Sequence, residues 1–358
     1  MTTFVTCYID LDKYEIRPPS RHKSDYLNYI KYTLSISKPL IFFVDEDLIP
    51  SLQEIRNSDI QYIPFKLTDS PYYKYFNKLQ NNRLKNPIHN DSPQKDTLNY
   101  MILQWSKMYF LEYVMRINPF NSEYFGWIDS GIGYLNSHYN IEEKMYKNAL
   151  IEFADTIPDK GVKLCCMKHI TRSEIQDRHF FYSHRRGNIC GGIITGPKSQ
   201  LHSFIQYFNW ELDDTLNREL IAMDEMIFAV IACEHSELTD LYYGDYSEIL
   251  INYNSVYMSW HLVYNSYILS MNEMNIDSCI HIMERCMNTI DRCPVDMRQY
   301  LLLYHLNILN HDLYDKNNID NRNYINNYIK FFLLHLNPDH PLIRTNLDKI
   351  NELLKKYE

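Results

Sequence analysis

The chain has 358 residues, of which 45% are hydrophobic, and its formal net charge is −9, which predicts two domains or one large domain with an extension. The negative charge argues against broad nucleic-acid binding, and no apolar stretch is long enough for a membrane span. The eight cysteines show no metal-ligand spacing and the N-terminus shows no signal-peptide pattern, so we expect a cytoplasmic protein with free thiols.

The first part of the chain alternates between strand-like and helix-like segments. A near-continuous apolar run such as PLIFFVDED (39–47) is typical of a strand buried on both faces. Apolar residues spaced by three and four positions predict the helices. The predicted order is strand 2–10, helix 24–36, strand 39–47, short helix 48–56 and strand 60–65.

The middle of the chain continues this alternation. It begins with a polar segment, residues 66–98, for which we expect a long surface excursion. The predicted elements that follow are helix 97–117, strands 124–129, 161–170 and 188–196, helices 198–217 and 224–236, and strand 238–246. Strands that alternate with helices indicate an α/β fold with a mainly parallel sheet flanked by helices.

The last quarter of the chain has a different character. Its segments are all helical, and they are predicted at 274–290, 295–309, 324–336 and 343–358. The sequence therefore predicts an α/β domain over 1–264 and an all-α C-terminal extension over 265–358.

The segment YFGWIDSGIG (124–133) is the first candidate for chemistry. All nine glycines of the chain lie between Gly126 and Gly244, and glycine is favoured where a backbone turns sharply or approaches a ligand. Asp129 ends a predicted strand, where α/β proteins bind ligands, and its carboxylate can coordinate a divalent cation. An equally good interpretation is that Asp129 caps a turn in which Gly131 and Gly133 are turn residues.

Six segments follow one another along the chain: FVTCYID, PLIFFVDED, WSKMYFLEYVMRINPF, YFGWIDSGIG, GNICGGIITG and DEMIFAVI. Together they resemble the HtrL/YibB family, and the resemblance covers roughly residues 3–250. Proteins of this family look like GT-A-type glycosyltransferases. The resemblance therefore implies transfer of a sugar from a nucleotide sugar, such as a UDP- or GDP-sugar, to a hydroxyl of a glycan or protein.

The resemblance also implies roles at the donor diphosphate. Asp129, followed by Ser130, takes the first position of the Asp-x-Asp motif that usually binds Mn²⁺ or Mg²⁺, and Gly131 replaces the second Asp. Lys107 can reach the donor, and Arg185 and Arg186 can add positive charge at the leaving group. The alternatives are that Lys107 is a solvated lysine on a helix, and that Arg185 and Arg186 belong to an ordinary basic loop.

Two further pairs complete the predicted site. Gly191 and Gly192 would let the donor sugar approach the backbone, unless they serve tight packing or a β-bulge. Asp224 or Glu225 would deprotonate or orient the acceptor hydroxyl, unless both only cap the helix that they begin.

Two other functions stay open on the sequence. One is a non-catalytic binding module on a degenerate glycosyltransferase fold, with the helical extension as the surface for a protein partner. The other is a nucleotidyltransferase, which would need a second acidic ligand near Asp129, supplied by Asp224 or Asp245.

Overall fold

The computed structural model describes most of the chain as two units. The described residues are 1–15, 23–86, 97–139, 141–158, 161–168, 170, 172–183, 188–254, 260–287, 290–310 and 319–355. The first unit is Met1–Asn254 and the second is Ser255–Glu358. The boundary predicted between residues 264 and 265 lies inside helix α11 (Trp260–Asn272).

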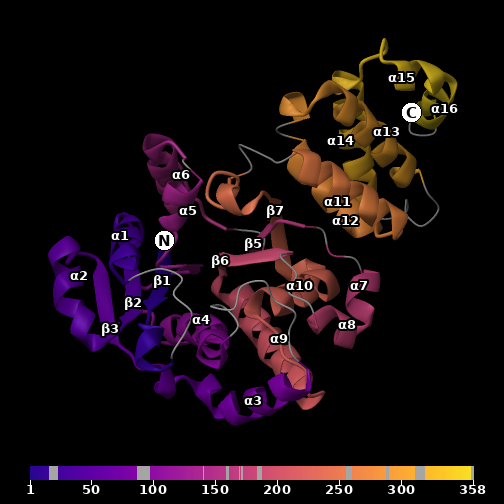
Figure 1. The fold of residues 1–358 in the computed structure, drawn as a ribbon. Helices are drawn as coiled ribbons and strands as arrows, with labels where there is room; N and C mark the ends of the chain where they lie inside the picture. The colour runs from indigo at the N-terminus through magenta and orange to yellow at the C-terminus, as the bar shows by residue number, and fades with distance from the viewer. Residues whose placement is uncertain are drawn as a thin grey trace. The chain divides into compact units, whose positions relative to one another are not determined.

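Seven strands of the first unit form one mixed sheet in the order β3-β2-β1-β4-β6-β5-β7 (Figure 1). They are β1 (Thr2–Tyr8), β2 (Leu40–Val44), β3 (Ile60–Pro64), β4 (Tyr124–Ile128), β5 (Val162–Cys166), β6 (Ile189–Pro197) and β7 (Thr239–Tyr243). Only β6 is antiparallel to its neighbours. The predicted α/β fold with a mainly parallel sheet flanked by helices is confirmed.

Helices cover both faces of this sheet. On one face lie α4 (Leu98–Ile117), α9 (Lys198–Asn217) and α10 (Asp224–Glu234), and on the other lie α1 (Lys23–Leu34), α2 (Ile49–Ile55) and α6 (Glu143–Asp155). Adjacent residues of β2 show the alternation, because successive side chains of a strand point to opposite faces. Phe43 stacks on Phe110 of α4 with ring centroids 4.4 Å apart, whereas Phe42 joins the core beneath α1 and α6.

The polar segment 66–98 contains a packed helix, so the predicted surface excursion is wrong for that part. Helix α3 (Phe76–Lys85) buries Leu79 and Asn82. The Asn82 amide donates to the carbonyls of Leu216 and Leu220 at 2.9 and 3.0 Å. The helix thus docks on the end of α9 through one narrow stripe, which a mostly polar sequence conceals.

Short elements complete the first unit. The short α-helices α5 (Tyr134–His138), α7 (Arg172–Gln176) and α8 (Arg178–Tyr182) were not predicted. The short 3-10 helices of this unit are η1 (Leu11–Lys13), η2 (Glu46–Leu48), η3 (Leu67–Asp69), η4 (Pro71–Tyr75), η6 (Ser236–Leu238) and η7 (Tyr246–Glu248).

The second unit is helical in all its described elements, as predicted. Besides α11 it contains α12 (Ile276–Cys286), η8 (Ile290–Arg292), α13 (Val295–Leu309), α14 (Ile319–His335), α15 (Pro341–Thr345) and α16 (Leu347–Lys355). At its centre, the buried His305 ring bridges the hydroxyls of Tyr267 and Tyr324 at 2.9 and 3.0 Å. Burial lowers the pKa of His305 to about 3, so the ring is neutral.

Two sequence-based expectations concern the whole chain. Across the described residues, none of the helices combines the length and the apolar character needed to cross a membrane. All eight cysteines are free thiols, and seven of them are buried.

Candidate functional site

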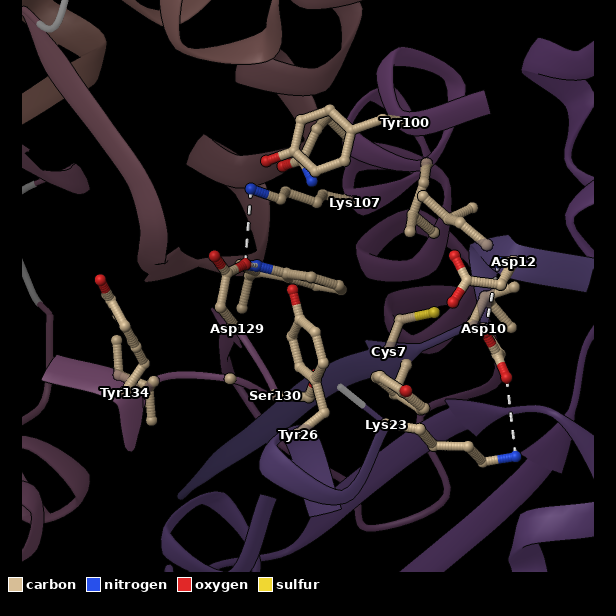
Figure 2. A pocket seen from close by; sticks show the side chains of 18 of the residues that line it. Cys7, Asp10, Asp12, Lys23, Tyr26, Tyr100, Lys107, Asp129, Ser130 and Tyr134 are labelled. Atoms are coloured by element: carbon tan, nitrogen blue, oxygen red, sulfur yellow. Dashed lines mark hydrogen bonds and ion pairs between the residues drawn. The ribbon is translucent and has the colours of Figure 1, made fainter. Parts of the chain in front are cut away.

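A cavity of about 280 Å³ opens at the carboxyl ends of β1 and β4 (Figure 2). These two strands are parallel neighbours. After β1, the chain adds β2 and β3 on one side of β1, and it then returns to add β4 on the other side. This reversal is the topological switch point at which α/β sheets bind ligands. Helices α1 and α4 supply further lining residues, among them Lys23 and Lys107.

Asp129 follows β4 directly and lines this cavity with its side chain 36% exposed. The Trp127 indole Nε1 donates to Asp129 Oδ1 at 2.7 Å, because residues two apart on a strand face the same side. The backbone is fixed too, since Asp129 N donates to the Gly192 carbonyl at 2.9 Å. Among the described residues the other carboxylate oxygen, Oδ2, has no hydrogen-bond partner, so it is the oxygen that Asp129 presents to a ligand.

Lys107 projects from α4 toward Asp129 with its side chain only 4% exposed. Its Nζ donates to the Gly191 carbonyl and to Asp224 Oδ2, both at 2.9 Å, and lies 3.4 Å from Asp129 Oδ1. Burial alone would lower the pKa of Lys107, but the carboxylates of Asp129 and Asp224 outweigh burial and raise that pKa above its usual value. Lys107 is therefore a fixed positive charge whose ammonium makes two hydrogen bonds and one further ion pair with protein groups.

Asp224 and Glu225 begin α10 behind this lysine. The Asp224 side chain is 1% exposed and forms a buried ion pair with Lys107. Glu225 is half-buried, and its Oε1 accepts a hydrogen bond from Gly191 N at 3.3 Å. Neither residue lines the cavity. A base must reach its proton, so the geometry favours a positioning role for Asp224 over the predicted role at the acceptor.

The two strand glycines have different surroundings. A Cβ at Gly191 would lie 2.8 Å from Asp224 Oδ2 and 3.1 Å from Lys107 Nζ. A Cβ at Gly192 would meet its nearest atom, on Ile249, at 3.4 Å, which is an ordinary contact. The space beside Gly191 is thus filled by the buried ion pair, and not by the donor sugar for which we expected it.

The segment after Asp129 packs against α1. Ser130 is buried and lines the cavity together with Gly131, whose nearest neighbour is the Tyr26 ring. A Cβ at Gly133 would lie 2.4 Å from the Tyr32 ring and 2.8 Å from the Tyr29 carbonyl. Gly133 therefore allows this close helix packing, which is a structural reason for the second glycine of the segment.

The structure also places residues at the cavity that the sequence analysis did not select. Five tyrosines line it, and they come from β1, α1, α4, α5 and η7: Tyr8, Tyr26, Tyr100, Tyr134 and Tyr246. Lys23 lines its other end, with Nζ 3.6 Å from Asp10 Oδ2. The 31 tyrosines of the chain were a signal, but their number does not tell which of them converge. The predicted donor ligands Arg185 and Arg186 lie outside the described residues.

Asp129 by itself does not fit a resident, all-protein site for Mn²⁺ or Mg²⁺. Such ions are usually held by one or two carboxylates together with substrate phosphates, and Gly131 removes the second carboxylate of the motif. One oxygen of Asp129 already accepts from Trp127 and lies beside the Lys107 ammonium. Across the described residues, no three His, Cys, Asp or Glu side chains come together as metal ligands.

Comparisons with known proteins match one family model and several solved structures. No curated protein matches the chain in sequence. Mouse xyloside xylosyltransferase 1, in its apo form, is 11% identical with a TM-score of 0.35 and covers 67% of this chain and 85% of its own. The 4-diphosphocytidyl-2C-methyl-D-erythritol synthase from Anaerococcus prevotii DSM 20548 is 12% identical with a TM-score of 0.31 and covers 71% and 94%.

The family match extends over most of the chain. The model described as "Bacterial protein of unknown function (HtrL_YibB)" matches residues 1–255, nearly the same residues as the first structural unit. The chain therefore belongs to the HtrL_YibB family.

Proposed function

We propose that the chain is a glycosyltransferase that moves a sugar from a nucleotide sugar to a hydroxyl group of a glycan or protein. The observation that carries this proposal is the Asp129 carboxylate at the switch point of the sheet. Trp127 and Lys107 hold one of its oxygens, and the other is left for a ligand. A fixed carboxylate oxygen accepts hydrogen bonds from sugar or ribose hydroxyls.

The reaction sets the requirements for the surrounding groups. The bond between the anomeric carbon and the diphosphate oxygen breaks, a bond to the acceptor oxygen forms, and the acceptor proton passes to a base. Negative charge then develops on the nucleoside diphosphate. Among the described residues that line the cavity, Lys23 and Lys107 are the cations. Lys107 is buried and held by two carboxylates, whereas the Lys23 side chain is 40% exposed and lies at longer range, 3.6 and 3.7 Å, from Asp10 and Asp47, so we assign the diphosphate to the end of the cavity at Lys23. Arg185 and Arg186, which lie outside the described residues, stay proposed as further donors.

The two acidic residues of α10 receive separate roles in this proposal. Asp224 holds Lys107, which in turn holds Asp129, so Asp224 and Lys107 act as positioning residues. Glu225 does not line the cavity either, but it is more exposed than Asp224 and catalytic contacts often tighten only when substrate binds, so we propose Glu225 as the group that takes the acceptor proton. The domain assignment follows the same logic, with the α/β unit as the nucleotide-sugar-binding domain.

A donor screen tests the proposal. The full chain is heated with UDP, GDP and a panel of UDP- and GDP-sugars, each with and without Mn²⁺, and the melting temperature is recorded. A ligand that binds only the folded state raises the melting temperature, by RT ln(1 + [L]/Kd) in free energy. Stabilisation by the sugars of one nucleotide, followed by release of that nucleoside diphosphate on incubation, supports the enzyme. Absence of any shift would instead favour a non-catalytic binding module.

A further inference from the structure

The Asp129 end of the cavity carries more negative than positive charge. One ammonium, that of Lys107, faces the carboxylates of Asp129 and Asp224. Within the described residues, one positive charge is therefore set against the two carboxylates that it contacts.

Two phenol groups face the same end of the cavity. Tyr100 projects from α4 and Tyr246 begins η7, and both line the cavity. Figure 2 shows the Tyr100 hydroxyl beside Lys107, on the side of the cavity where Asp129 lies. Neither phenol hydroxyl has a hydrogen-bond partner in the described part of the chain. Burial raises the pKa of both tyrosines, so both hydroxyls keep their protons and can donate.

This set of groups has a definite chemical preference. Sugar hydroxyls donate to a carboxylate and also accept from a phenol, so an uncharged sugar satisfies Asp129 and both tyrosines together. The apolar face of a sugar ring also packs on aromatic side chains. A carboxylate on the sugar would instead meet like charges in a partly buried site, where they repel strongly.

We propose that the Asp129 end of the cavity selects an uncharged sugar, a neutral hexose or pentose, as the transferred part of the donor, and that it rejects uronic and sialic acids. The proposal rests on the proposed nucleotide-sugar function, and it adds the class of sugar. The residues that determine this specificity are Asp129, Tyr100 and Tyr246.

Matched donor pairs test the proposal by isothermal titration calorimetry on the full chain. UDP-glucose is compared with UDP-glucuronic acid, UDP-galactose with UDP-galacturonic acid, and GDP-mannose with GDP-mannuronic acid. For the nucleotide that binds, we expect the neutral member to bind at least tenfold more tightly. Asp129→Asn should reduce that ratio severalfold, because it removes one of the repelling charges. Tyr100→Phe and Tyr246→Phe should weaken the neutral sugar nucleotide and leave the affinity for the free nucleoside diphosphate unchanged.

The outcomes separate this inference from the function on which it rests. If a uronic acid donor binds as tightly as its neutral partner in the native chain, the sugar class is wrong while the glycosyltransferase proposal stands. If neither nucleoside diphosphates nor any sugar nucleotide bind, both fail. Thermal unfolding of each variant shows whether a lost affinity reflects a lost fold, and the comparison on the native chain needs no variant.

Discussion

Replacing Lys107 by Met isolates the contribution of the buried ion pair. Asp224 is 1% exposed and Lys107 Nζ donates to it at 2.9 Å, so the substitution leaves a buried carboxylate without its counter-ion. Breaking a buried pair in this way costs about 3–5 kcal/mol. At about 2–4 °C per kcal/mol for a domain of this size, the melting temperature should fall by roughly 6–20 °C. Asp224→Asn in the same background removes the buried charge and should recover most of that loss.

Urea denaturation of four proteins measures this coupling: the native chain, Lys107→Met, Asp224→Asn and the double variant. Tryptophan fluorescence reports mainly on the first unit, which contains three of the four tryptophans. The double-mutant cycle should give a coupling free energy of at least about 2 kcal/mol, since the two side chains are in direct contact. If Lys107→Met costs less than about 1 kcal/mol and the two effects add, the pair is not the buried element that we describe.

Three further predictions use matched changes. Gly191→Ala should cost about 1–3 kcal/mol because the new methyl group overlaps the ion pair, whereas Gly192→Ala should cost less than about 1 kcal/mol, as measured by urea denaturation. Gly133→Ala should likewise cost about 1–3 kcal/mol against α1, and more than Gly131→Ala; equal costs within either pair would contradict these contacts. As pH falls below about 6.5, the unfolded chain takes up the His305 proton first, because burial holds the folded pKa at about 3. The contribution of His305 to the free energy of unfolding should therefore fall by about 1.4 kcal/mol per pH unit between these values. Between pH 7 and pH 5, denaturation of His305→Gln should show a smaller loss of stability than the native chain, and an equal loss in both proteins would refute this.

Local patterns were sufficient to predict most of the fold. Most of the strands are short apolar runs, α9 has periodic apolar positions and α4 and α10 are long and largely apolar, so neighbouring residues decide these elements. Helix α3 was missed because only a narrow stripe of it is buried, and one of the helices that it packs on, α9, lies more than a hundred residues later. The sequence contains no local signal for such a contact.

The candidate site likewise combines features that the local sequence predicts with features that only distant contacts determine. Asp129 was predicted because a strand end is a local feature, and its bond from Trp127 follows from the two-residue repeat of that strand. The pairing of Lys107 with Asp224 joins residues 117 positions apart. A glycine is needed at position 191 because both of those side chains lie against it, so its role could be assigned only from tertiary contacts.

The turnover of a nucleotide sugar by Asp129→Ala tests the central claim most directly. The donor identified in the screen is incubated with the native chain and with this variant, and release of the nucleoside diphosphate is measured. Asp155→Ala serves as the control, because it removes an exposed carboxylate from α6. We predict that Asp129→Ala abolishes release while its melting temperature stays close to that of the control. Unchanged release by the folded Asp129→Ala variant would contradict the role assigned to this residue.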